Sequence, residues 1–170
     1  QVIAQQRYAT TLGTSTAATT ANLLPLRSSA DVITRSFYDA AGRVIFTVAP
    51  DNSVHEIRYD ALGRVSAELD YINKASSSVT WTSAYLSSLQ SASDRTTSRT
   101  YDAAGRVVEQ YSPKLTGVVV NGVAVDGFAK QKFTYNAQGL VESVERGFVK
   151  LTTDTAFSGP TSVTKNVYDA

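Results

Sequence analysis

The chain has 170 residues, enough to bury the core of one domain, and 42% of them are hydrophobic. Its 16 basic and 15 acidic residues are spread evenly and leave a net charge of +1, which argues against a nucleic-acid partner. No apolar run approaches the about 20 residues of a membrane-spanning helix, and the absence of cysteine excludes disulfides and thiol chemistry.

The first part of the chain predicts a strand over residues 1–9 and then a connecting loop over 10–30, which is rich in Thr, Ala and Ser. Residues 32–72 alternate between apolar and polar side chains, as short antiparallel strands do. They predict a meander of four strands. The hairpin turns between these strands are expected at residues 39–42, 50–53 and 60–63.

Residues 73–93 interrupt this meander with a polar loop and a short helix. Apolar side chains recur there at helical spacing, at Trp81, Tyr85, Leu86 and Leu89. This spacing predicts a helix over residues 81–92 with Thr80 or Thr82 as its N-cap. Such an apolar stripe is more often a core contact than a binding groove, so we expect the helix to pack on the sheet.

The last third of the chain predicts further strands. Asn121-Gly122 lies within an apolar run over 118–125 and is a strong signal for a two-residue hairpin turn. Because this run is prone to aggregation, we expect it to be paired or covered. Further strands are predicted over residues 129–136, 140–150 and 161–169.

One motif, Tyr-Asp-x-x-Gly-Arg, recurs along the chain. It occurs intact three times, a decayed copy begins at Tyr135, and the sequence ends within another copy that begins at Tyr168. The motif residues are Tyr38, Asp39, Gly42 and Arg43; Tyr59, Asp60, Gly63 and Arg64; Tyr101, Asp102, Gly105 and Arg106; and Tyr135, Asn136 and Gly139. Because a motif is cut off at the end, and because there is no initiator Met, we expect a segment of a longer protein.

The motif has the composition of a tight hairpin turn. Asp at its start accepts a hydrogen bond from the backbone N–H two residues on, and Gly supplies the left-handed conformation that closes the hairpin with a one-residue bulge. In the first copy, Tyr38 and Arg43 are then expected to face each other. A guanidinium over the phenol ring would contribute about 0.5–1 kcal/mol. We therefore interpret Tyr and Arg as a structural staple.

A longer period is superimposed on the motif. Tyr8 and Tyr71, Asp31 and Asp94, and Tyr38 and Tyr101 are each separated by 63 residues. This relates residues 8–38 to 71–101 and predicts a short helix near 17–27. We treat residues 1–170 as one repeat segment, whose units stack into a longer sheet or solenoid because a single unit leaves strand edges unpaired.

The sequence offers no arrangement typical of catalysis, and no cofactor-binding or metal-binding residue is predicted. His55 is the only histidine, and its neighbour Glu56 points to the opposite face of a strand. The motif aspartates already have a role in their turns. No calcium loop, phosphate-binding glycine loop or nucleophilic serine motif is present. We therefore expect a protein that is not an enzyme.

The motif, at spacings of 21, 42, 34 and 33 residues, resembles the Rhs/YD-repeat family of large bacterial proteins. The resemblance implies an all-β strip of antiparallel hairpins within a larger β-solenoid or spiral shell. It also implies a secreted or cell-surface location and a shell that encloses a C-terminal toxin. The family's self-cleavage segment is absent from these residues, so no autoproteolysis is expected here.

Partners are expected to be the rest of the repeat array and an encapsulated toxin domain. The alternative is an extracellular filament or adhesin module, whose outer surface binds glycans or neighbouring subunits. Rows of exposed Tyr and Trp would suit stacking on carbohydrate, whereas Tyr at a repeated position is more often a packing element. Nucleic acid is not expected as a partner, and no membrane span is expected in this segment.

Overall fold

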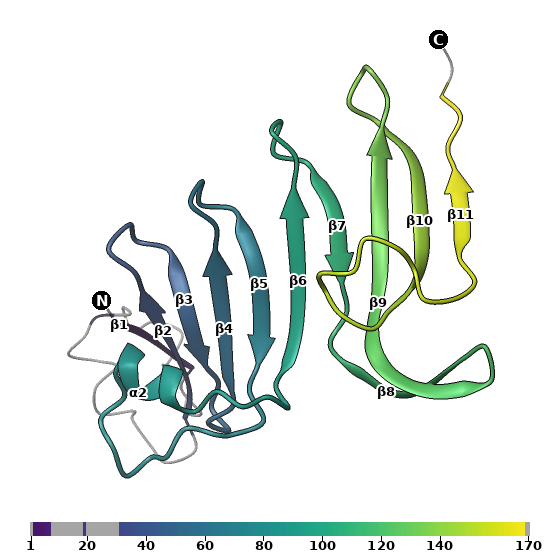
Figure 1. Ribbon diagram of the computed structural model, residues 1–170. Helices are drawn as coiled ribbons and strands as arrows, with labels where there is room; N and C mark the ends of the chain where they lie inside the picture. Colours follow the sequence, from purple (N-terminus) through teal and green to yellow (C-terminus); the bar gives the residue numbers. More distant parts are fainter. Residues whose placement is uncertain (1, 8–18, 20–30, 169–170) are drawn as a thin grey trace. The chain divides into compact units, whose positions relative to one another are not determined.

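The computed structural model describes residues 2–7, 19 and 31–168, and these form an almost entirely β structure (Figure 1). The strands are β1 (Val2–Arg7), β2 (Val32–Tyr38), β3 (Val44–Val48), β4 (Val54–Tyr59), β5 (Val65–Asp70), β6 (Arg95–Tyr101), β7 (Val107–Tyr111), β8 (Leu115–Val120), β9 (Val123–Tyr135), β10 (Val141–Val149) and β11 (Ser162–Lys165). The described helix is α2 (Ser83–Ser88). The predicted all-β class with antiparallel hairpins is confirmed. Of residues 17–27, where a short helix is predicted, the structure describes residue 19 alone, so this prediction otherwise lies outside the described residues.

The chain divides into two compact units. The first contains residues 1–56 and 71–91, and the second contains residues 57–70 and 92–170. In the first unit, β1, β2, β3 and the start of β4 pair in sequence order, all antiparallel. In the second unit, β5 pairs with β6, β6 with β7, β7 with β9, β9 with β10, and β10 with β11, while β8 pairs with the other end of β9.

The core of the first unit gathers apolar side chains from β2, β3, β4 and the segment that follows residue 70. Its buried residues are Phe37, Phe46, Val48, Val54, Tyr71, Ala75 and Leu86. The rings of Phe46 and Tyr71 meet edge to face with centroids 6.4 Å apart. The buried Leu86 of α2 confirms the prediction that the helix packs on a core.

The helix α2 is shorter than the sequence predicts. Thr82 caps it, because its Oγ1 accepts a hydrogen bond from the Tyr85 N–H at 3.1 Å. At the other end, the N–H groups of Leu89 and Gln90 bond to carbonyls three residues back rather than four. This tighter turn ends the helix at Ser88, so the predicted end at residue 92 is wrong, whereas the cap at Thr82 is confirmed.

In the second unit, the strand β9 is longer than the sequence predicts. The hairpin predicted within 118–125 and the strand predicted over 129–136 leave a gap at residues 126–128, but β9 runs unbroken from Val123 to Tyr135. Glycine is needed inside this strand for close packing, because a Cβ at Gly127 would collide with the Val149 carbonyl and the Phe148 ring. The predicted turn at Asn121-Gly122 is confirmed, with φ values of 51° and 82°.

Strand registers in the two units follow the same 63-residue period. In β1 and β2, Ala4 lies opposite Arg35, and in β5 and β6 Ala67 lies opposite Ser98, with both numbers higher by 63. The same offset relates β2–β3 to β6–β7, including the register shift just before Tyr38 and just before Tyr101. The period therefore reflects backbone pairing as well as sequence.

Candidate functional site

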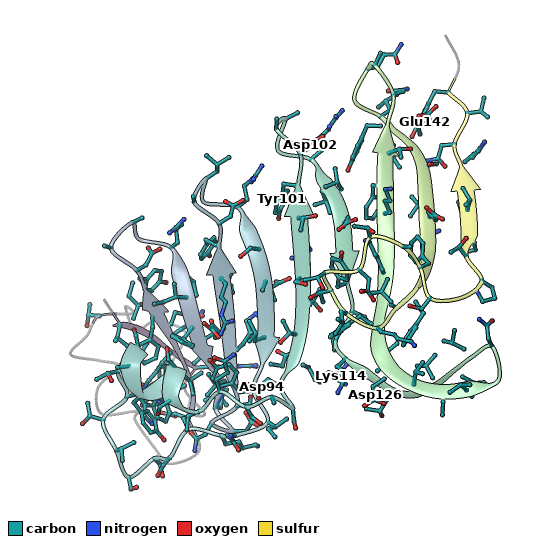
Figure 2. The ribbon with its side chains drawn as sticks, in the orientation of Figure 1. Asp94, Tyr101, Asp102, Lys114, Asp126 and Glu142 are labelled. Carbon is teal, nitrogen blue, oxygen red and sulfur yellow. The ribbon has the colours of Figure 1, made fainter. Side chains whose placement is uncertain are left out.

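The motif residues lie at the hairpin tips, where each Tyr ends a strand and the next four residues form the turn. Figure 2 labels Tyr101 and Asp102 at the tip of the β6–β7 hairpin. In each intact copy the aspartate N–H donates to the arginine carbonyl at 2.9 Å, and the glycine N–H donates back to the aspartate carbonyl. The glycines Gly42, Gly63, Gly105 and Gly139 all have φ between 77° and 82°, as the turn chemistry predicts.

The aspartate carboxylate organises its own turn. In the third copy, Asp102 Oδ1 accepts the Arg106 N–H at 2.9 Å, and Asp102 Oδ2 accepts Arg106 Nε at 2.7 Å. The other two intact copies repeat both bonds, with Asp39 and Arg43 and with Asp60 and Arg64. Each carboxylate therefore fixes both the backbone and the side chain of its arginine.

These bonds favour the charged form of the aspartates. The Arg43 N–H, followed by the Arg43 side chain, lowers the pKa of Asp39 below its ordinary value of 3.8. For Asp60 and Asp102, the backbone N–H of Arg64 or Arg106 is again the largest influence, and the pKa is lowered although partial burial opposes it. The carboxylates thus stay ionised at neutral pH, as structural ion pairs require.

The arginine of one motif contacts the tyrosine of the following motif, and this differs from the predicted pairing. The Arg64 guanidinium lies 4.5 Å from the centroid of the Tyr101 ring, and Arg64 Nη1 donates to the Asp102 carbonyl at 3.1 Å. Tyr101 Oη donates in return to the carbonyl of Val65, the residue after Arg64, at 2.6 Å. The staple therefore joins two hairpins.

The next pair of motifs repeats this link. The Arg106 guanidinium lies 4.3 Å from the Tyr135 ring centroid, and Tyr135 Oη donates to the Val107 carbonyl at 2.6 Å. We call this arrangement the Arg–Tyr link. It consists of an arginine over the next tyrosine ring, with that tyrosine's hydroxyl on the carbonyl that follows the arginine.

The expectation that Tyr38 and Arg43 face each other is wrong. Tyr38 lies opposite Val44, because the bulge shifts the register by one residue after Phe37. Arg43 is held instead by Asp39 at 2.7 Å. A guanidinium bound by its own turn can reach sideways to a neighbouring hairpin, as Arg64 and Arg106 do.

The decayed copy shows which parts of the motif are separable. Asn136 Oδ1 accepts the N–H groups of Gln138 at 3.1 Å and Leu140 at 2.9 Å, so the amide replaces the carboxylate within the turn. Leu140 takes the place of the arginine and supplies no guanidinium. Tyr168 Oη still donates to the Val141 carbonyl at 2.8 Å, which keeps the hydroxyl half of the link.

A buried charged cluster in the second unit has no clear sequence signal. Lys130 is only 2% exposed, and its Nζ lies 2.7 Å from Glu109 Oε1 and 3.1 Å from the Asp154 carbonyl. Tyr111 Oη donates to Glu109 Oε2 at 2.7 Å. Alternation along β9 places Lys130 on the same face as the exposed Lys132 and Thr134, so it does not predict burial, and the acid that pairs with Lys130 comes from another strand.

The charges of Lys130 and Glu109 stabilise each other within this cluster. Burial opposes ionisation of Glu109, but hydrogen bonds from Lys130 and Tyr111 outweigh it and lower its pKa. Burial likewise opposes the charge on Lys130, and the bonds to Glu109 and Tyr111 outweigh it and raise that pKa. Both groups remain charged at neutral pH, so neither is suited to exchange protons near pH 7.

The described ranges bring together no catalytic or metal-binding group of side chains among the candidates considered from the sequence. His55 lies in β4 opposite Thr47 of β3. Among residues 2–7, 19 and 31–168, no group of three or more His, Asp or Glu side chains is placed to hold a metal ion. Within the same residues, no helix has the length and hydropathy needed to cross a membrane.

Comparison with known proteins leaves the resemblance to Rhs/YD repeats resting on the motif itself. The sequence matches no protein-family model and no curated protein.

Proposed function

We propose that this chain is a non-enzymatic structural module of a large Rhs-type repeat protein. Its hairpins stack with those of the rest of the array to build the wall of a shell around a C-terminal toxin. The observation that carries the proposal is the Arg–Tyr link, seen between Arg64 and Tyr101 and again between Arg106 and Tyr135. A repeated contact between successive hairpins is what an extended wall requires.

Two features of the hairpins support the proposal that they build a shell wall. The tyrosine hydroxyl binds a backbone carbonyl of the preceding hairpin, at 2.6 Å in both Tyr101 and Tyr135, so the link does not depend on the side chain that follows the arginine. Each arginine is held by its own aspartate before it reaches the next ring. Each hairpin therefore supplies a tyrosine that contacts the preceding hairpin and an arginine that contacts the following one.

Protease protection of the complete protein tests this proposal. In the shell account, the region after the repeats resists a nonspecific protease while the repeats are intact, and it is digested once the repeats are unfolded in denaturant. The matched control is the C-terminal region expressed by itself, which should be digested at once. Equal digestion rates for the free region and the same region within the complete protein would contradict encapsulation.

The second candidate is an extracellular filament or adhesin module that binds glycans or neighbouring subunits. One observation favours it: the side chain of Trp81 lines a pocket in the first unit together with an arginine and several hydrogen-bonding groups. Retention of the complete protein on acidic and neutral glycan surfaces tests this role. If the protein bound none of these surfaces, the adhesin role would be contradicted and the structural role would be the one still supported.

A further inference from the structure

The first unit contains a pocket of about 360 Å³ beside its core. Residues of β1, of β2, of the β3–β4 turn and of the segment 77–81 line it. Ligand sites in proteins commonly have volumes of about 300–1,000 Å³. The pocket is therefore large enough for a small ligand or for the end of a longer one.

The strand residues of the pocket lie on the face of the sheet that carries the core. Arg35 pairs with the buried Val48, and Phe37 pairs with the buried Phe46. Val2 of β1 lies opposite Phe37. Because residues directly opposite each other share one face of a sheet, the pocket has an apolar floor that continues the core.

Arg35 is the only charged residue among the described residues that line the pocket, and its charge is not neutralised. Its guanidinium lies 4.9 Å from the Trp81 ring centroid. It forms no ion pair with any residue in the part of the chain that the structure describes, whereas Arg64 and Arg106 are each bound to an aspartate. A half-buried guanidinium in this state attracts an anion, and its planar donors match a carboxylate.

Trp81 is fixed in place and can hold the arginine. Its Nε1 donates to the Ser76 carbonyl at 2.7 Å, and the Ser76 N–H donates to Tyr85 Oη at 2.8 Å. Tyr85 belongs to α2, so the ring is tied to the helix through two hydrogen bonds. A rigid aromatic wall positions the guanidinium before a ligand arrives, which lowers the entropic cost of binding.

Asn52 supplies neutral hydrogen-bonding groups. Its backbone has a φ of 66°, its N–H donates to the Ala49 carbonyl, and its carbonyl accepts the Ala75 N–H, each at 2.9 Å. Its carboxamide makes no hydrogen bond to any described residue, so one acceptor and two donors remain for a ligand. The hydroxyls of Ser77 and Thr80 add to this set.

The two polar side chains Arg35 and Asn52 depart from the 63-residue repeat. The residues 63 positions later are Ser98 and Leu115. Ser98 nevertheless pairs with Tyr111 in the register in which Arg35 pairs with Val48. The backbone pairing therefore does not require an arginine at this position, and its side chain is available for another role.

The chemistry of the lining favours the carboxyl end of a peptide. No acidic side chain is present among the described lining residues, so the ammonium group of a free amino acid would find no charged partner. The last residue of a peptide instead carries a carboxylate, an amide N–H and a side chain. These three groups match the guanidinium of Arg35, the carboxamide oxygen of Asn52 and the apolar floor of the pocket.

We propose that this pocket binds the C-terminus of a peptide whose last residue is apolar. Arg35 binds the α-carboxylate through two parallel N–H···O bonds. Asn52 Oδ1 accepts the N–H of the last peptide bond. The side chains of Val2, Phe37 and Val79 contact the last side chain of the peptide. The proposal goes beyond both candidate functions, because the pocket lies within one unit and needs neither a shell nor a glycan.

Trp81 provides a direct test, because it is the only tryptophan in the chain. Its fluorescence is followed while the 170-residue protein is titrated with an N-acetylated hexapeptide that lacks tryptophan and ends in leucine. The same peptide with a C-terminal amide is titrated in parallel. The expected result is saturable binding of the free acid, at least about tenfold tighter than the amide, since the amide loses hydrogen bonds to a charged group.

A third peptide tests the apolar floor. It differs from the first only in ending in glycine, so it keeps the carboxylate and the last N–H but loses the apolar side chain. It should bind about tenfold more weakly than the leucine peptide, because less apolar surface is buried.

Two variants and a control localise the binding. Arg35→Gln is expected to weaken binding of the leucine peptide at least about tenfold. Asn52→Gly removes the carboxamide but keeps the backbone, because glycine adopts a φ of 66° freely, so this variant remains informative even if Arg35→Gln fails to fold. It should weaken binding at least about threefold. The control is Arg99→Gln, which changes a strand arginine paired with Glu68 in the second unit and should leave binding unchanged.

Three results would overturn the proposal. The first is no saturable fluorescence change with the leucine peptide. The second is equal affinity for the free acid and the amide, and the third is unchanged affinity in folded Arg35→Gln or Asn52→Gly protein. Two competitors are also titrated. If acetate binds as tightly as the peptide, or if an oligosaccharide of hexuronic acid binds more tightly, the pocket is not a site for a peptide C-terminus.

Discussion

At the scale of single residues, the motif aspartate performs two tasks that the decayed copy separates. It accepts backbone N–H groups within the turn, as Asn136 also does, and it binds the arginine side chain, as Asn136 does not. The first task forms the hairpin. The second orients the guanidinium toward the next tyrosine, so loss of the charge should affect the link between hairpins more than the turn.

Substitution of Asp102 tests this separation. Asp102→Asn keeps the acceptor for the Arg106 N–H and should lower the thermal unfolding midpoint only slightly. Asp102→Ala removes the acceptor as well and should lower the midpoint further. Calorimetry of the two variants beside the unmodified chain measures the difference. An equal loss in both variants would show that the ion pair, rather than the turn, provides all of the aspartate's contribution.

The lowered pKa values of Asp39, Asp60 and Asp102 predict acid sensitivity. A carboxylate whose pKa is lower in the folded state contributes stability above its unfolded value of 3.8, and this contribution is lost as the pH falls through the folded value. Stability should therefore fall below about pH 4. Chemical unfolding at a series of pH values measures it, and a triple Asp→Asn variant should show a shallower decline over the same range.

The Arg–Tyr link makes a prediction about specific residue pairs. In a double-mutant cycle, Arg106→Gln and Tyr135→Leu should show a coupling free energy of about 0.5–1 kcal/mol, as expected for an exposed cation–π contact. The matched control is Arg106→Gln with Tyr101→Leu, which share one hairpin and should couple less. Stronger coupling within the hairpin than between hairpins would support the pairing expected from sequence and contradict the observed one.

At the scale of elements, the turns were predictable and the contacts between hairpins were not. Asp102 and Gly105 determine their turn through local chemistry, which a six-residue motif contains in full. The contact of Arg106 with Tyr135 depends on the register shift at the bulge and on which strands are neighbours. Neither is encoded by residues adjacent in sequence.

Two further elements show the same limit. Asp126-Gly127 has the composition of a turn, but Gly127 lies inside β9 because the strand must pack closely against Val149 and Phe148. Lys130 has the polarity of a surface residue, but it is buried because Glu109 on β7 neutralises it. In both cases a residue from a distant element overrides the local preference.

The buried cluster around Lys130 predicts a large cost for breaking the ion pair. Lys130→Met leaves Glu109 partly buried without its partner and should cost about 3–5 kcal/mol of unfolding free energy. Replacing Lys130, Glu109 and Tyr111 together by Met, Leu and Phe should recover most of this loss, because the Glu109 carboxylate is then no longer left without its charged partner. Urea unfolding of the single and triple variants measures both values. A triple variant no more stable than the single one would contradict this explanation.

At the scale of the whole molecule, the shared strand registers show how the sequence extends. The pairing of β1 with β2 reappears 63 residues later in β5 with β6, although most of the side chains differ. The backbone of one unit is therefore a template that tolerates new side chains.

The central claim is that linked hairpins build a wall, and electron microscopy of the complete protein that contains this segment tests it most directly. The shell account predicts closed, hollow particles with density inside them. The control is the same protein with Tyr101 and Tyr135 both replaced by Leu, in which two of the links are lost and closed particles should be fewer. Open fibres or extended rods from the unmodified protein would contradict the shell and favour the filament or adhesin.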